Sequence, residues 1–134
     1  MVSFRRIALL TLVFIVIAST VEAADRAPVN VLEAARKNII LTLKGVNESM
    51  QADAIQTLIE LHRQYPEMDF SEAVPALLGM LDGHRSYSVR ILSALALAEI
   101  GGISYKDAIS KRALNDQHPC VRHVCAGIMA EFKM

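Results

Sequence analysis

The chain has 134 residues, of which 53% are hydrophobic and 21% charged, and its 14 basic residues balance 14 acidic ones. This length allows one domain with a modest core and excludes a catalytic domain joined to a separate substrate domain. The high hydrophobic content excludes a disordered chain. The absence of net charge argues against a nucleic-acid-binding protein, which must neutralise many phosphates.

The N-terminal segment has the pattern of a secretory signal peptide. Two arginines precede an apolar run over residues 7–18, and Val21 and Ala23 are small residues at the minus-three and minus-one positions of a cleavage site. The alternative is an uncleaved anchor, but a spanning helix needs about 20 apolar residues. We predict that residues 1–23 are removed and that residues 24–134 are secreted or periplasmic, with no stable membrane anchor.

The remaining chain is predicted to be helical. Its apolar residues recur with a helical period, and no run alternates as a half-buried strand does. Start and stop signals, among them Pro66 and the Gly101-Gly102 pair, divide it into six helices, with Ser104 and Asp107 as caps of the fifth. We expect these helices at about 30–45, 48–64, 71–82, 87–100, 104–114 and 119–133.

The second, fourth and sixth predicted helices are copies of one another. A gapless alignment anchored on Met50, Val89 and Val121 shows this, and Leu43, Leu81 and Leu114 precede the anchors at similar distances. Two further sets then coincide, the apolar Leu58, Leu97 and Met129 and the acidic Glu60, Glu99 and Glu131. Two-helix units spaced by 39 and 32 residues are typical of an α-solenoid, because stacking buries the apolar surface that one hairpin leaves exposed.

These residues resemble those of a known repeat family. Residues 74–82, followed by Val89-Arg90 and Gly101, look like a HEAT repeat, and residues 114–116 followed by Val121-Arg122 look like another. The chain is also similar to short secreted HEAT-like proteins of bacteria. The resemblance implies an all-α fold, a short α-solenoid of about three antiparallel hairpins, with units at about 30–66, 69–102 and 104–134.

The resemblance further implies a ladder of aspartate and arginine side chains between adjacent units. Asp116 and Arg122 keep the six-residue spacing of the family, whereas Asp82 and Arg90 are eight apart. In the first unit Gln51 stands in place of the arginine. These spacings favour the ladder in the third unit and argue against it in the middle unit.

A solenoid generally binds other macromolecules through the surface lined by one helix of each pair. We therefore predict a non-catalytic scaffold module that binds a protein partner and needs no cofactor, since no nucleophile motif or phosphate-binding glycine loop is found. Glu60, Glu99 and Glu131 form an acidic row suited to a basic partner, and Arg90 and Arg122 form a parallel basic row. The alternatives are solvated glutamates and structural arginines.

Residues 118–125 suggest an alternative function, a small metal-binding protein. Imidazole and thiolate are ligands that zinc or copper prefers, and His118, Cys120 and His123 lie close together in sequence. Cys125 falls on the far side of the same helix, about 140° from Cys120, so it neither completes the site nor forms a disulfide within this helix.

The last predicted helix carries Met129 and Phe132 on a face with no following unit in the alignment. Stacked units need polar or covered end faces. A homo-oligomer formed through this C-terminal repeat face is therefore a further prediction.

Overall fold

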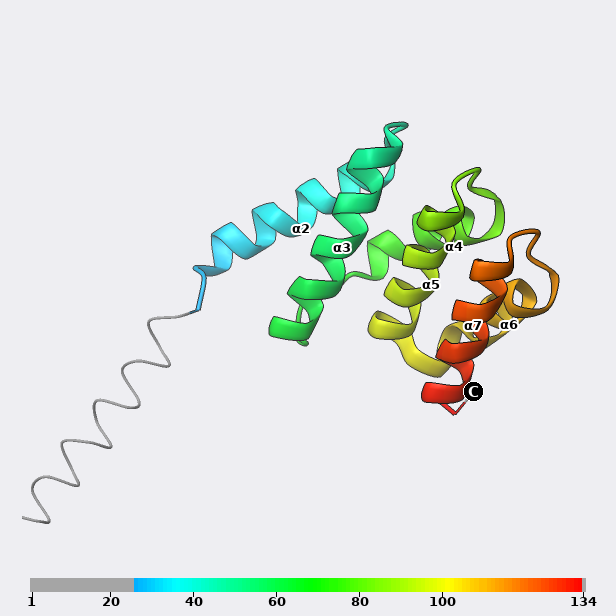
Figure 1. Ribbon diagram of the computed structural model, residues 1–134. Helices are drawn as coiled ribbons and strands as arrows, with labels where there is room; N and C mark the ends of the chain where they lie inside the picture. Colours follow the sequence, from blue (N-terminus) through cyan, green and yellow to red (C-terminus); the bar gives the residue numbers. More distant parts are fainter. Residues whose placement is uncertain (1–25, 134) are drawn as a thin grey trace, which may run out of the picture. The chain divides into compact units, whose positions relative to one another are not determined.

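The computed structural model describes residues 26–133, and no strand occurs among them. Their elements are α2 (Val29–Leu43), α3 (Glu48–Gln64), the 3₁₀ helix η1 (Ser71–Ala73), α4 (Val74–Gly83), α5 (Tyr87–Gly101), the 3₁₀ helix η2 (Gly102–Tyr105), α6 (Lys106–Asn115) and α7 (Pro119–Glu131) (Figure 1). The all-α prediction is confirmed. The predicted signal peptide lies outside the described residues.

The chain divides into two compact parts after Glu33, inside α2. In the first part, the carbonyl of Pro28 accepts hydrogen bonds from the N–H groups of Val31 and Leu32 and so begins the helix. The core and the stacked helices lie within the second part, from Ala34 onward.

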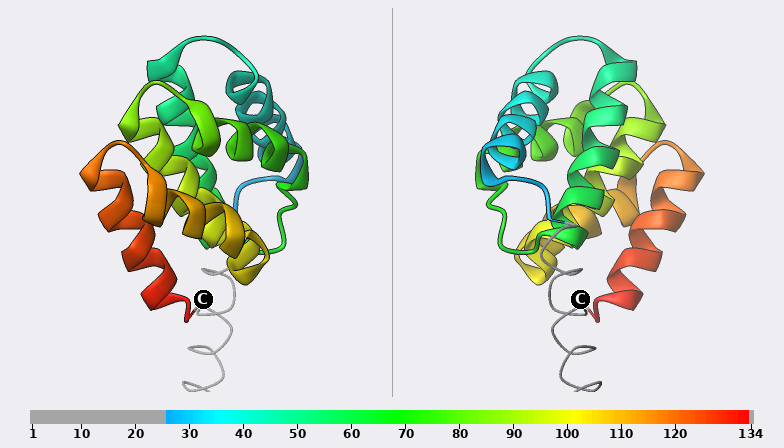
Figure 2. Two further views of the ribbon diagram at one scale, coloured as in Figure 1. Left: turned by 90° about the vertical axis from the view of Figure 1, so that its right-hand side faces the viewer. Right: turned by 90° about the vertical axis from the view of Figure 1, so that its left-hand side faces the viewer.

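The helices of this second part stack in two layers. In one layer α3 packs against α5 and α5 against α7, and in the other α4 packs against α6 (Figure 1). The pairs α4–α5 and α6–α7 are hairpins, and their connecting loops, 84–86 and 116–118, lie at one end of the stack together with loop 44–47 (Figure 2). This is the arrangement of a short α-solenoid.

One apolar cluster runs through the stack. Leu58 and Leu97 are fully buried, and Met129 is half-buried and packs against the same cluster, so these three aligned positions share a common seam. Met50 departs from the pattern: it is 55% exposed, although the aligned Val89 and Val121 are buried. At Met50, in the first turn of α3, the first unit therefore does not contribute to this apolar seam.

Leu114 is a second departure, because it is 74% exposed whereas Leu43 and Leu81 are buried. The side chains of His84 and Asp116 each accept the N–H group two residues later, so these two loop positions correspond. Counting back from them aligns Leu114 with Asp82 and not with Leu81. The predicted match of Leu114 to the buried leucines is wrong by one residue.

Most helix ends lie where the sequence predicts them, but the fifth helix does not. Neither Ser104 nor Asp107 caps α6, which begins after Tyr105 without a side-chain cap. The Gly101-Gly102 pair turns the chain directly into η2, since Gly102 has φ +50° and a Cβ on Gly101 would lie 2.0 Å from the Tyr105 ring. Only glycine fits both requirements without strain.

By length and composition alone, the stretch Tyr87–Asn115 is apolar enough to cross a membrane. This is weak evidence, because the core helices of globular proteins pass the same test. In the structure the stretch comprises α5, η2 and α6, and α5 is a central helix of the stack.

Candidate interaction surface

The predicted acidic row lies along α3, α5 and α7. Glu60 and Glu131 are exposed, and neither forms an ion pair within the described residues. Glu99 is different: its Oε2 atom lies 3.2 Å from Nε of Arg63, and its Oε1 atom lies 3.8 Å from Nδ1 of His62. The row therefore offers two open carboxylates at its ends and one in the middle that α3 already neutralises.

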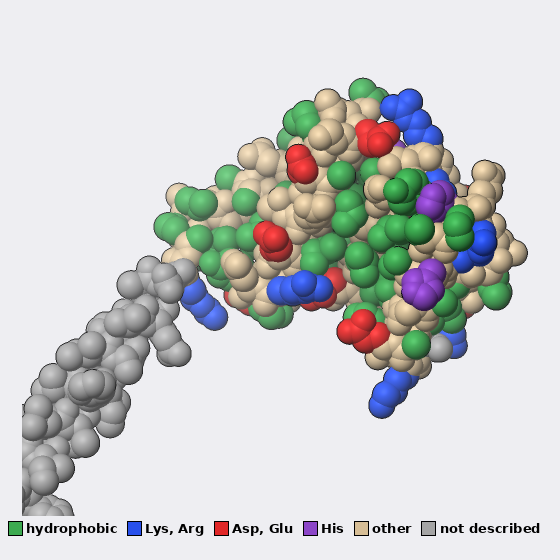
Figure 3. All heavy atoms as spheres, in the orientation of Figure 1, with side chains coloured by type: hydrophobic (Ala, Val, Ile, Leu, Met, Phe, Trp, Pro, Cys, Tyr) green, Lys and Arg blue, Asp and Glu red, His purple; other side chains and the backbone are tan. Residues whose placement is uncertain are grey.

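Apolar side chains lie on the same face of the central helix. Tyr87 is 44% exposed and Leu95 is 37% exposed, with half-buried Ile91 between them at helical spacing. Leu95 and Glu99 are also four residues apart, so the apolar strip leads into the acidic row. Hydrophobic side chains gather over α3 and α5 and toward α7 on this side (Figure 3). Tyr87, Leu95, Glu60, Glu99 and Glu131 together define what we call the second-helix face.

A ladder of polar side chains crosses the stack at the end where the hairpin loops lie. Gln51, Arg90 and Arg122 occupy the fourth position of α3, α5 and α7. Each donates a hydrogen bond to the carbonyl six residues earlier, at 2.7 Å for Gly45, 2.6 Å for His84 and 2.7 Å for Asp116. The shared contact confirms the gapless alignment of the three helices.

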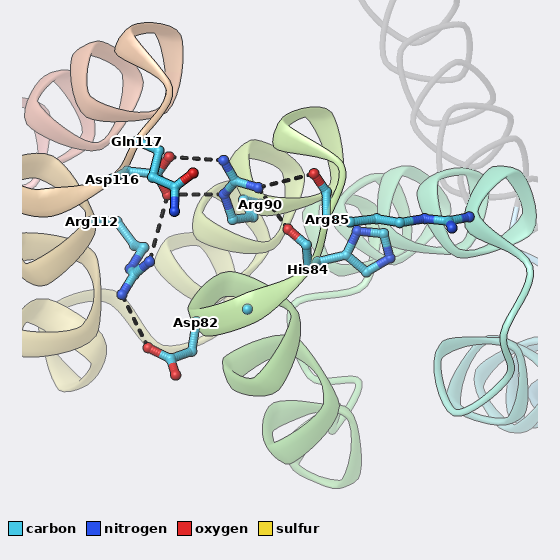
Figure 4. A pocket seen from close by; sticks show the side chains of 8 residues that line it. Asp82, His84, Arg85, Arg90, Arg112, Asp116 and Gln117 are labelled. Carbon is cyan, nitrogen blue, oxygen red and sulfur yellow. Dashed lines mark hydrogen bonds and ion pairs between the residues drawn. The ribbon is translucent and has the colours of Figure 1, made fainter.

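The junction between the second and third hairpins is a buried ion pair. Arg90 donates from Nε and Nη2 to both carboxylate oxygens of Asp116, at 2.9 and 2.8 Å, and these side chains are 12% and 1% exposed (Figure 4). Asp116 also accepts the N–H of His118. Burial raises the pKa of Asp116, but the bonds from Arg90 and His118 and the charges of Arg90 and Arg112 outweigh it, so the pKa lies below its ordinary value.

The junction between the first and second hairpins uses neutral groups at the same positions. Oε1 of Gln51 lies 3.3 Å from Nε2 of His84. Since Nδ1 of His84 accepts the N–H of Ser86 at 3.1 Å, the neutral ring carries its proton on Nε2 and donates it to Gln51. His84 thus takes the place of the aspartate, and Gln51 takes the place of the arginine.

The repeat geometry agrees with a comparison to known families. A family model described as HEAT repeats matches residues 37–130. The chain belongs to the HEAT-repeat family. HEAT repeats commonly mediate protein–protein interaction and are generally non-catalytic. No curated protein and no solved structure matches the chain.

The structure corrects the prediction for the middle HEAT unit, because Arg90 does form the ladder there. Its partner is Asp116 of the next unit, and Asp82 is not involved. Asp82 is 64% exposed and binds Lys111 at 2.8 Å and Arg112 at 3.2 Å; the hydrogen bond and the charge of Lys111 lower the pKa of its carboxyl. The sequence signal that could have found the pair is the six-residue offset from Arg90 to His84, which matches the offset from Arg122 to Asp116.

An open hollow of about 210 Å³ lies beside the ladder, between the loops of the second and third hairpins (Figure 4). Its charged lining is already paired. Arg112 bridges Asp82 at 3.2 Å and Asp116 at 3.7 Å, although its buried Nε atom has no hydrogen-bond partner. The contacts in the hollow therefore connect the two hairpins.

The three candidate metal ligands do not converge on one point. His118 caps α7, its Nδ1 atom accepts the N–H of Cys120 at 3.2 Å, and its ring stacks on Tyr87 with centroids 3.9 Å apart. Cys120 and His123 are exposed. Within residues 26–133, no group of three or more His, Cys, Asp or Glu side chains is placed to hold a metal ion.

Cys125 is buried in the core and Cys120 is exposed, and both are free thiols. Burial, together with the nearby charge of Asp116, raises the pKa of Cys125 to about 11. A thiol that stays protonated is a poor nucleophile and a poor metal ligand, so Cys125 acts as a small core residue.

Proposed function

We propose that this HEAT-repeat protein is an exported, non-catalytic module that binds a protein partner on the second-helix face. The observation that carries the proposal is the exposed pair Tyr87 and Leu95 on the central helix, bordered by the open carboxylates of Glu60 and Glu131. Aromatic and apolar anchors with a charged rim are typical of protein-binding surfaces. The partner segment is therefore basic and partly apolar.

Ion pairing distinguishes the charged residues that can contact a partner from those with a structural role. Glu60 and Glu131 are free to attract lysine or arginine side chains, which raises the association rate more than the affinity. Glu99 is engaged by Arg63, and Arg90 is engaged by Asp116. Glu99 and Arg90 therefore hold helices together, and the partner contacts fall on the two outer glutamates and the apolar strip.

Partner binding is tested by in-cell cross-linking from a photoreactive residue at Ser88, which is exposed on α5. We expect a specific protein adduct that is lost in the Leu95→Glu variant, because a charge replaces the apolar anchor. The matched control is Leu114→Glu, which changes an exposed leucine on α6. An adduct that survives Leu95→Glu contradicts the proposed face.

The acidic rim is tested separately by the double variant Glu60→Lys with Glu131→Lys. We expect a slower association rate with the captured partner, and salt should no longer slow association, because the two lysines replace the attraction with repulsion. Asp107→Lys is the control, since Asp107 is exposed on α6. Equal association rates for the double variant and the Asp107→Lys control would show that Glu60 and Glu131 do not attract the partner. The proposed role of the apolar strip would not be affected.

Export is supported by the apolar N-terminal run and its small-residue cleavage site. Expression of the full chain in a bacterial host, followed by cell fractionation and mass spectrometry, tests it. We expect a periplasmic or secreted product whose first residue is Ala24. An unprocessed chain in the cytosol would overturn this part of the proposal.

Self-association through the C-terminal repeat face stays a prediction, and it competes with the partner helix inferred below for the outer side of α7. Phe132 is 41% exposed there, and Met129 is half-buried. Sedimentation at tens of micromolar tests it, and a clean monomer would argue against it.

A further inference from the structure

Arg122 repeats half of the contacts that Arg90 makes. Its Nη1 atom donates to the carbonyls of Asp116 and Gln117 at 2.7 and 3.2 Å, as Nη1 of Arg90 donates to those of His84 and Arg85 at 2.6 and 3.3 Å. The Nε and Nη2 atoms of Arg90 then hold Asp116. Within the described residues, the same two atoms of Arg122 contact no acceptor. The guanidinium of Arg122 is therefore held in place through Nη1, while Nε and Nη2 remain available to donate hydrogen bonds.

The helix surface beside Arg122 is also uncovered. On α5, Ala94 and Ala98 follow Arg90, which pairs with Asp116 in the loop before α7, at four-residue steps, and both alanines are buried. The aligned residues of α7, Ala126 and Ala130, are exposed. Small side chains at this spacing allow another helix to approach closely, as α7 approaches α5.

We propose that Arg122, Ala126 and Ala130 form a second interaction surface, the end surface, which binds an α-helix of a partner protein that carries an aspartate or glutamate in the loop just before its first turn. The carboxylate of that residue accepts two hydrogen bonds from Arg122, as Asp116 does from Arg90. The end surface is separate from the second-helix face and does not depend on it.

The charges select a foreign acidic helix over a second copy of the chain. Arg122 is the charged side chain on this side of α7, because Glu131, nine residues later, falls about 180° away around the helix. Two copies paired through this side of α7 would therefore place no carboxylate of α7 opposite either arginine. A copy stacked head to tail would present Gly45 at the position of Asp116, and glycine has no side chain to offer.

The test uses a synthetic peptide with the sequence of residues 113–131, both cysteines replaced by serine, because this segment carries the aspartate and helix that bind Arg90. We expect it to shift the amide NMR signals of Arg122, Ala126 and Ala130 and the Nε–H signal of Arg122 in the labelled protein. A peptide with asparagine in place of Asp116 should bind at least tenfold more weakly, since it loses the charge and one acceptor oxygen.

Variants of the protein complete the test. Arg122→Gln should weaken the binding of the peptide that carries aspartate at least tenfold. Arg122→Lys should weaken this binding too, because lysine keeps the charge but cannot donate two parallel hydrogen bonds. Arg85→Gln is the control at an exposed arginine in a hairpin loop and should change nothing. No binding, equal binding of the asparagine peptide, or a dimer that dissociates in Arg122→Gln would each overturn the proposal.

Discussion

The two junctions between the hairpins occupy the same place in the repeat but have different chemistry. Arg90 and Asp116 join the second and third hairpins through two charge-assisted hydrogen bonds, whereas Gln51 and His84 join the first and second through one neutral contact at 3.3 Å. Both junctions keep the hydrogen bond to the carbonyl six residues earlier. Both junctions thus share the hydrogen bond that fixes the donor side chain, whereas the charge of the interacting pair differs between them.

The chemical difference between the junctions affects the stability lost when one partner is removed more than it affects the stability of the intact protein. A buried ion pair loses hydration that its Coulomb attraction only partly offsets, so it contributes little beyond an apolar contact of similar size. Removing one partner, however, leaves the other charge buried and unpaired. An amide and an imidazole lose less hydration on burial, and either can be removed at lower cost.

The largest effect is expected for Asp116→Ala. It leaves the 12%-exposed Arg90 without its carboxylate and also removes the acceptor for the N–H of His118, so the free energy of unfolding should fall by about 3–5 kcal/mol. Urea unfolding measures this. Asp82→Ala is the control at an exposed carboxylate, and its effect should be far smaller. Similar losses in both variants would contradict a special role for the buried pair.

A second experiment converts the neutral junction into an ionic one. Gln51→Arg and His84→Asp should each destabilise the protein alone, because each places a charge opposite a neutral partner. The double variant should recover, with a coupling energy of about 1–3 kcal/mol in a double-mutant cycle. Strict additivity of the two single changes would show that the first and second junctions do not share one geometry.

Breaking the neutral junction should cost less. His84→Ala removes the contact to Gln51 and the acceptor for Ser86, but no charge is left buried. We expect a loss of about 1 kcal/mol in the free energy of unfolding, measured in the same urea series. A loss as large as that of Asp116→Ala would remove the contrast between the junctions.

The smallest expected effect concerns pH. The pKa of Asp116 is lower in the folded protein than in the unfolded chain, so its contribution is present above the unfolded pKa and is lost as the pH falls through the folded pKa. Stability should therefore decline more steeply on acidification in the natural protein than in Asp116→Asn. Parallel pH profiles would contradict the lowered pKa.

Local signals predicted the helices well because they act within one or two turns. α3 begins and ends at the predicted residues, with Asn47 accepting the N–H of Met50 at its start and Pro66 following its end. The buried positions of Leu58 and Leu97 follow from the helical period. The sixth helix was likewise expected at Pro119, where α7 begins. Pattern and capping therefore sufficed for the all-α solenoid.

The candidate sites were harder to predict because they depend on side chains from different hairpins. The eight-residue spacing of Asp82 and Arg90 argued against a ladder in the middle unit, but Asp116, 26 residues from Arg90, lies next to it once α5 and α7 stack. Glu99 fits the predicted row, yet Arg63 of the neighbouring helix neutralises it.

Helical periodicity, caps and the repeat spacing are properties of short segments, so they can be read from the order of residues and lead to a stack of helical hairpins. Pairing among charges and the exposure of a given apolar residue are set by distances across the stack. Those distances exist only after folding, because packing decides which neighbours meet: it leaves Leu95 exposed on α5 and buries Asp116 against Arg90.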